Sequence, residues 1–160
     1  MAALPVFYYD LGDPECYLTA EELKGQAEWE PVLASQLGLA GGEPDRTQIE
    51  RRVRELGLQP VHWPTPWPPD TSRAMLAATY AKRIGRGVAF SLAAFRQAFA
   101  GGRDLGVQDT VLIAGAACEM HPSALIKGMS LRATTQALAA ATERARRDGV
   151  TALPAVVGAR

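Results

Sequence analysis

Cysteine, net charge and long apolar runs are all scarce in this chain. It has 2 cysteines among 160 residues, and its 17 Lys and Arg residues balance 17 Asp and Glu residues. Because Cys16 and Cys118 lie far apart, a disulfide framework and a zinc site built from paired Cys-x-x-Cys motifs are excluded, and we expect no bound metal. Balanced charge also argues against a nucleic acid or a membrane surface as the main partner.

No segment is apolar for long enough to cross a membrane. The longest weakly charged stretch, residues 107–120, is interrupted by Asp109 and Glu119. It falls short of the roughly 20 apolar residues that a spanning helix needs. The first residues lack the basic and apolar regions of a secretory signal, so we expect an unprocessed cytoplasmic protein.

The order of strand-like and helix-like segments predicts an α/β fold with a helical insertion. Apolar, β-branched and aromatic residues predict strands at 5–11, 27–33 and 150–158, and residues 58–61 could return to the sheet. We expect Asp109 and Ser130 to open the helices that follow them, and Cys118 to lie in the core. Helices are expected at residues 14–24, 46–56, 72–83, 88–100, 109–120, 122–127 and 130–147.

The first expected helix begins with a strong local signal. Asp13 is a good N-cap, Pro14 suits the first helical position, and Glu15 adds negative charge to the first turn. A second local feature is the proline-dense segment 62–71, which predicts an ordered loop. Its Trp63 and Trp67 could line a groove and stack on an aromatic ligand, or they could simply pack.

Five segments, in this order, resemble one family. They are similar to the first strand with its active-site turn, the second strand, the proline-rich approach to the insertion, the insertion itself, and the cis-proline strand of the DsbA-like thioredoxin superfamily. The resemblance is strongest to its branch of 2-hydroxychromene-2-carboxylate isomerases and kappa-class glutathione transferases. The segments are residues 6–18, 29–33, 67–74, 90–105 and 149–157.

The resemblance implies a definite architecture. It predicts a three-layer, thioredoxin-like α/β domain over residues 1–71 and 145–160, with an all-helical insertion over residues 72–144. Pro154 would follow a cis peptide bond. The strand and helix that end the family's fold would be missing after Arg160, and a homodimer could then cover the open edge of the sheet.

The resemblance also implies an activity. Family members carry Cys-Pro-x-Cys, or a Ser that donates to the sulfur of glutathione, at the N-terminus of the first helix. Asp13 and Cys16 stand at the two motif positions and would be the catalytic residues. The implied function is a glutathione-dependent isomerase or transferase of small aromatic carboxylates. Glutathione would be held by Pro14, Trp63, Trp67, Leu153 and Pro154.

Asp13 leaves the chemistry open, because a carboxylate cannot form a disulfide and repels a thiolate. Two unit charges 4 Å apart repel by about 1 kcal/mol in water and about 4 kcal/mol at an effective dielectric near 20. A helix dipole stabilises a negative charge at its N-terminus by about 0.3–1 kcal/mol. Asp13 could be a helix cap or a general base. Cys16 could be a thiol-disulfide or monothiol centre, or a small core residue. The whole chain could also be a non-catalytic binding scaffold.

Overall fold

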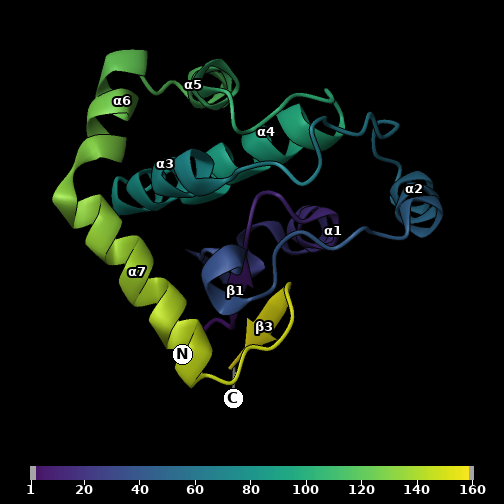
Figure 1. Ribbon diagram of the computed structural model, residues 1–160, viewed down its shortest axis with the longest axis horizontal. Coiled ribbons are helices and arrows are strands. Elements are labelled where there is room, and N and C mark those ends of the chain that lie inside the picture. Colours follow the sequence, from purple (N-terminus) through teal and green to yellow (C-terminus); the bar gives the residue numbers. More distant parts are fainter. Residues whose placement is uncertain (1–2, 159–160) are drawn as a thin grey trace.

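The computed structural model describes residues 3–158 and contains a small mixed sheet, with most of the helices on one side of it (Figure 1). Its strands are β1 (Val6–Tyr9), β2 (Glu28–Pro31) and β3 (Ala155–Val157), in the order β2-β1-β3. Strand β1 runs parallel to β2 and antiparallel to β3. The three strands predicted from the sequence are therefore confirmed.

The helices follow the predicted order. Strands β1 and β2, with α1 between them in the chain, form the parallel pair. Along the chain, the helices from α3 to α6 follow α2 and precede the long helix α7. Their bounds are α1 (Pro14–Leu23), α2 (Arg46–Glu55), α3 (Ser72–Arg83), α4 (Gly87–Phe99), α5 (Gln108–Ala117), α6 (Pro122–Ser130) and α7 (Arg132–Arg147), with short 3-10 turns η1 (Lys24–Gln26) and η2 (Ala34–Leu37).

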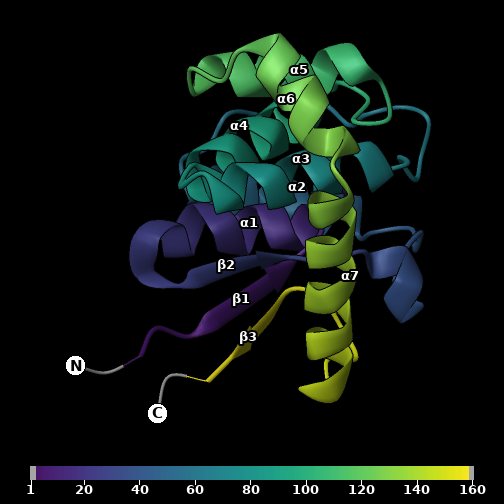
Figure 2. The same ribbon diagram turned by 90° about the vertical axis from the view of Figure 1, so that its left-hand side faces the viewer.

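The two faces of the sheet have different cover. Phe7 and Tyr9 of β1 stack at 5.1 Å and meet Trp29 of β2 edge-on, within the large core that α1, α3 and α4 complete. Tyr8 packs on the other side with Ala145 near the end of α7. Figure 2 shows this layering, with the insertion helices stacked over α1 and α1 over the sheet. The division into two domains stays a prediction.

Several local expectations are wrong. Residues 58–61 do not join the sheet, because Gly57 takes a left-handed conformation and Leu58 donates back to Val53 at the end of α2. Asp109 lies inside the first turn of α5, and Val107 is the N-cap residue without a side-chain bond. Ser130 ends α6, where its hydroxyl donates to carbonyls of the preceding turn.

Cys118 is also placed differently from the expectation of a core residue. It is the C-cap residue of α5 and only partly buried, with its thiol against the carbonyls of Ala114 and Gly115. Within residues 3–158, no helix has the length and apolar character to cross a membrane.

Candidate functional site

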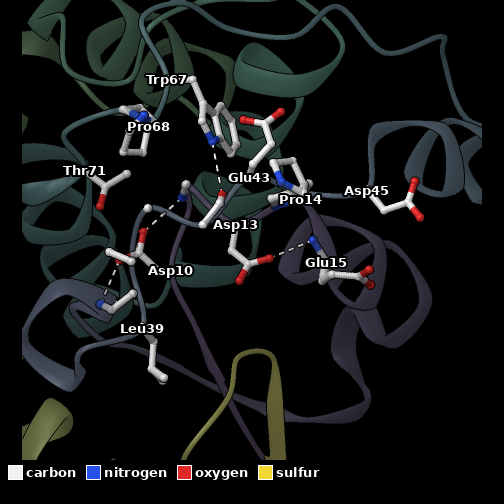
Figure 3. Close-up of a pocket in the computed structure, with 17 residues that line it drawn as sticks. Asp10, Asp13, Pro14, Glu15, Leu39, Glu43, Asp45, Trp67, Pro68 and Thr71 are labelled. Atoms are coloured by element: carbon white, nitrogen blue, oxygen red, sulfur yellow. Dashed lines mark hydrogen bonds between the residues drawn. The ribbon is translucent and has the colours of Figure 1, made fainter.

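A cavity of about 250 Å³ lies at the N-terminus of α1. Its walls come from the β1–α1 turn, from residues 39–45 before α2, and from the proline-rich loop before α3 (Figure 3). These three segments are far apart in the sequence. The parallel β1–α1–β2 unit puts the helix N-terminus at the carboxyl end of β1, and the two loops fold over it.

Asp13 opens α1 in the way the sequence predicts. Its Oδ1 accepts hydrogen bonds from the backbone N–H of Glu15 at 2.8 Å and of Cys16 at 3.2 Å. Its backbone is extended, and Pro14 follows at the first helical position. These two bonds satisfy helix N–H groups that have no partner inside the helix. Asp13 and Pro14 both line the cavity.

Asp10 is the site residue that the sequence analysis did not identify. Only 3% of it is exposed, yet it lines the cavity. Its Oδ1 accepts from Gly12 N–H at 2.9 Å and its Oδ2 from Ala34 N–H at 3.0 Å. The signal in the sequence is an acidic residue near the end of an apolar strand, three positions before a helix cap.

Gly12 makes the turn fit against the proline-rich loop. A Cβ atom at this position would lie 2.8 Å from Cγ2 of Thr71, closer than real carbon contacts allow. A larger residue at this position would therefore force Thr71 to shift.

The two aspartates have perturbed proton affinities. Burial raises the pKa of Asp13 to about 6, although its two backbone hydrogen bonds act in the opposite direction, and the charges of Asp10 and Glu15 raise it further. Burial also raises the pKa of Asp10, against the bonds from Gly12 and Ala34. At both groups, desolvation outweighs the hydrogen bonds that stabilise the ionised form. Asp13 therefore changes protonation state close to neutral pH.

Cys16 lies on the other side of the same turn. It is completely buried in the core and does not line the cavity. Burial, and then the charge of Asp13, raises the pKa of its thiol well above the usual range. A buried thiol that stays protonated is a poor nucleophile. The structure thus supports the interpretation of Cys16 as a small core residue.

Of the two tryptophans proposed to line a groove, one does. Trp67 lines the cavity, and its indole N–H donates to the carbonyl of Gly42 at 3.3 Å (Figure 3). Trp63 lies behind it, edge-on at 5.9 Å, and donates to Glu50. Trp63 supports the wall rather than forming it.

The segment before β3 lies outside the cavity wall. The Leu153–Pro154 peptide bond is cis, and both residues are partly buried. Leu153 packs against the clusters on both faces of the sheet, and neither residue lines the cavity. Their role in holding glutathione stays a prediction.

The two histidines do not form a second site. His62 is exposed with its ring against the carbonyl of Ala100, and His121 caps α6 by accepting from Ser123 N–H. Among residues 3–158, no three His, Cys, Asp or Glu side chains are grouped as metal ligands.

These features define a fold. A parallel β1–α1–β2 unit, helices inserted before α7, and a cis-proline before an antiparallel strand are the DsbA-like thioredoxin fold, and the cavity lies at the helix N-terminus that carries the active-site turn in the resemblance described above. No model of a protein family matches the chain, and no curated protein matches it by sequence.

Solved structures confirm the fold. A 2-hydroxychromene-2-carboxylate isomerase superposes with a TM-score of 0.84 at 16% identity, covering 98% of this chain and 86% of the other. The cytosolic disulfide reductase DsbM from Pseudomonas aeruginosa gives 0.69 at 15% identity, with coverages of 98% and 85%. The same reductase with GSH gives 0.65 at 13% identity, with coverages of 97% and 89%.

Proposed function

We propose that this chain binds a small molecule in the cavity and that Asp13 moves protons on it, so that the reaction is an isomerisation. One observation carries this proposal. A carboxyl group at the N-terminus of α1 has its Oδ1 held by two backbone N–H groups and a pKa of about 6, and it lines the cavity.

The chemistry needs no other reactant. The ionised carboxylate takes a proton from a C–H or O–H group of the ligand and returns it to a different atom, so that bonds and protons balance within one molecule. Oδ2 accepts no hydrogen bond from the described part of the chain, which leaves it available for this transfer. An acid–base group works best when its pKa lies near the working pH.

The oxidoreductase and monothiol alternatives have less support. Both need an accessible, ionised thiol at Cys16. Its complete burial and its raised pKa oppose both requirements. Asp13 cannot replace a thiol in disulfide exchange.

Glutathione-dependent isomerisation of an aromatic carboxylate is the second candidate. It is favoured by the two neighbours in fold, one an isomerase and one solved with GSH. Protonated Asp13 could donate a hydrogen bond to a thiolate, whereas ionised Asp13 would repel it. This candidate therefore requires glutathione to bind more tightly below pH 6 than above it.

Exchange of ligand protons with deuterium tests the first candidate. Aryl ketones that carry anionic, neutral or cationic substituents are incubated with the protein in D₂O and followed by NMR. We expect exchange beside the carbonyl for at least one ketone, rising with pH around a midpoint near 6. Asp13→Asn should lose about 100-fold or more of this rate, the usual range for a general base.

Matched controls separate the alternatives. Cys16→Ala should retain the exchange rate, and so should Asp109→Asn, which removes an exposed carboxylate on α5. Exchange that survives Asp13→Asn, or no exchange with any ketone, contradicts the first candidate. Binding without exchange supports the non-catalytic scaffold. An unchanged melting temperature in millimolar glutathione at pH 5.5 and 7.5 contradicts the second candidate, because a ligand of the native state raises it.

A further inference from the structure

We propose that the cavity selects an organic cation, an amine or guanidine attached to a small apolar group, over an anion of the same shape. The inference rests on the proposed function of the same cavity and goes further by naming the class of ligand. It reverses the charge of the aromatic carboxylate that the resemblance implies.

The charged side chains of the cavity wall are all acidic. Among its 17 lining residues there is no Lys, Arg or His, and five are acidic. The five are Asp10, Asp13, Glu15, Glu43 and Asp45. A ligand therefore meets acidic side chains from two of the three segments that form the cavity, the β1–α1 turn and residues 39–45.

Most of this charge is not neutralised within the described residues. Glu15 pairs with Arg52 at 2.7 Å, and Glu43 with Arg46 at 2.8 Å. Asp10, Asp13 and Asp45 form no ion pair within residues 3–158; each accepts hydrogen bonds from backbone N–H groups, and Thr71 adds a side-chain bond to Asp10. A cation in the cavity would supply the missing countercharge.

The chain's own Arg46 indicates what such a cation would contact. Its guanidinium lies over the ring of Trp63 at 4.8 Å and over that of Trp67 at 5.7 Å, while it pairs with Glu43. Trp67 and Glu43 both line the cavity. The edge of the site thus already binds one planar cation by an aromatic face and a carboxylate together.

The size and walls of the cavity define the rest of the ligand. About 250 Å³ suits a single ring with a short substituent. Trp67 and Pro68 give one part of the wall an apolar surface, and Leu39 lies away from them in Figure 3. We expect the apolar part of the ligand against Trp67 and Pro68 and its charged group beside Asp13.

Three probes of similar shape and different charge test the inference: benzylamine, benzyl alcohol and benzoate. Binding at pH 7.5 is measured from the NMR signal of the Trp67 indole N–H, which lies in the cavity wall. We expect the Kd of benzylamine to be at least tenfold lower than that of benzoate and several-fold lower than that of benzyl alcohol. Affinity for benzylamine should fall several-fold between pH 7.5 and 5, as Asp13 becomes protonated.

Two variants locate the effect. Asp13→Asn keeps a good helix cap while removing the charge, so it should weaken benzylamine binding several-fold. Asp109→Asn should leave it unchanged. Equal or tighter binding of benzoate or benzyl alcohol would overturn the inference and leave the proposed function standing, since a ligand would still occupy the cavity. A benzylamine affinity that changes neither in Asp13→Asn nor with pH would also overturn the inference. If none of the probes shifts the Trp67 signal, the inference is overturned, and the proposed function is still decided by the exchange of ketone protons.

Discussion

Acidic side chains are treated in opposite ways at the two ends of α1. Near its C-terminal end, Glu21 has a side chain only 4% exposed, and Arg96 holds both of its oxygens at 2.9 Å. On the neighbouring β2, Glu30 pairs with Lys82 at 2.8 Å and with Arg144 at 3.1 Å. At the N-terminal end, Asp10 and Asp13 accept hydrogen bonds from backbone N–H groups, and neither forms an ion pair within residues 3–158.

This difference separates carboxylates that hold the fold together from one that can react. A paired carboxylate keeps its charge and joins two elements. Asp13 is partly buried without a cation, so its charge is costly and its proton is exchanged near neutral pH. Breaking the Glu21–Arg96 pair should therefore lower the stability of the fold, and removing the charge of Asp13 should raise it.

Arg96→Met should have the largest effect, a loss of about 3 kcal/mol in the free energy of unfolding. It leaves Glu21 buried with its negative charge unpaired. Urea denaturation at pH 7 measures the loss. Glu143→Gln, which breaks an exposed pair with Arg146, should change stability by no more than about 0.5 kcal/mol. Equal losses of stability in the two variants would contradict the distinction between the buried pair of Glu21 and exposed ion pairs.

Asp13→Asn should stabilise the protein by about 2 kcal/mol at pH 7.5 and have little effect at pH 4. The pKa of Asp13 is raised to about 6 in the folded state, so the folded protein holds this proton more tightly than the unfolded chain. The stability that this proton contributes is present at pH 4 and is lost as pH rises through 6. Urea midpoints of both proteins across this range measure the effect. A stability difference that does not change with pH would contradict it.

Cys16→Ser should cost about 1–2 kcal/mol, because it places a hydroxyl group in an apolar core. Cys118→Ser, at a partly exposed position, should cost less than about 0.5 kcal/mol. Iodoacetamide should label Cys118 of the native protein and leave Cys16 unlabelled at pH 8. Labelling of Cys16 without unfolding would restore the thiol alternative.

Much of the fold could be predicted from local signals, because those signals agree with the tertiary structure. Apolar runs mark β1, β2 and β3, and the sequence Asp13-Pro14-Glu15 marks the start of α1. Where a boundary depends on distant packing, prediction fails. Ser130 has the composition of an N-cap, yet α6 continues through it, with Met129 and Gly128 buried beside it.

The site could be predicted only in part for the same reason. Asp13 follows from its position in the turn, but the acidic character of the cavity needs residues 39–45 folded over α1, which no local pattern indicates. Asp10 could not be distinguished from a residue that simply ends a strand. Its role depends on hydrogen bonds to Gly12 and to Ala34, which lies 24 residues further along.

Glu43→Gln should have the smallest effect, less than about 0.5 kcal/mol on stability, because its pair with Arg46 is exposed. Its value is as a contrast with Asp13, since both residues line the same cavity. Thermal unfolding at pH 7.5 should show no stabilisation of the kind expected for Asp13→Asn. A gain in stability at pH 7.5 would mean that the unfavourable charge belongs to Glu43, at the edge of the cavity, and not to Asp13.

The pKa of Asp13 tests most directly whether this residue is an acid–base group. The ¹³C chemical shift of its carboxyl carbon, assigned by comparison with Asp13→Asn, can be followed by NMR between pH 3 and 8. We predict a titration midpoint near pH 6. A midpoint near 4, the ordinary value for an aspartate, would mean that Asp13 is only a helix cap and would contradict its role as the acid–base group.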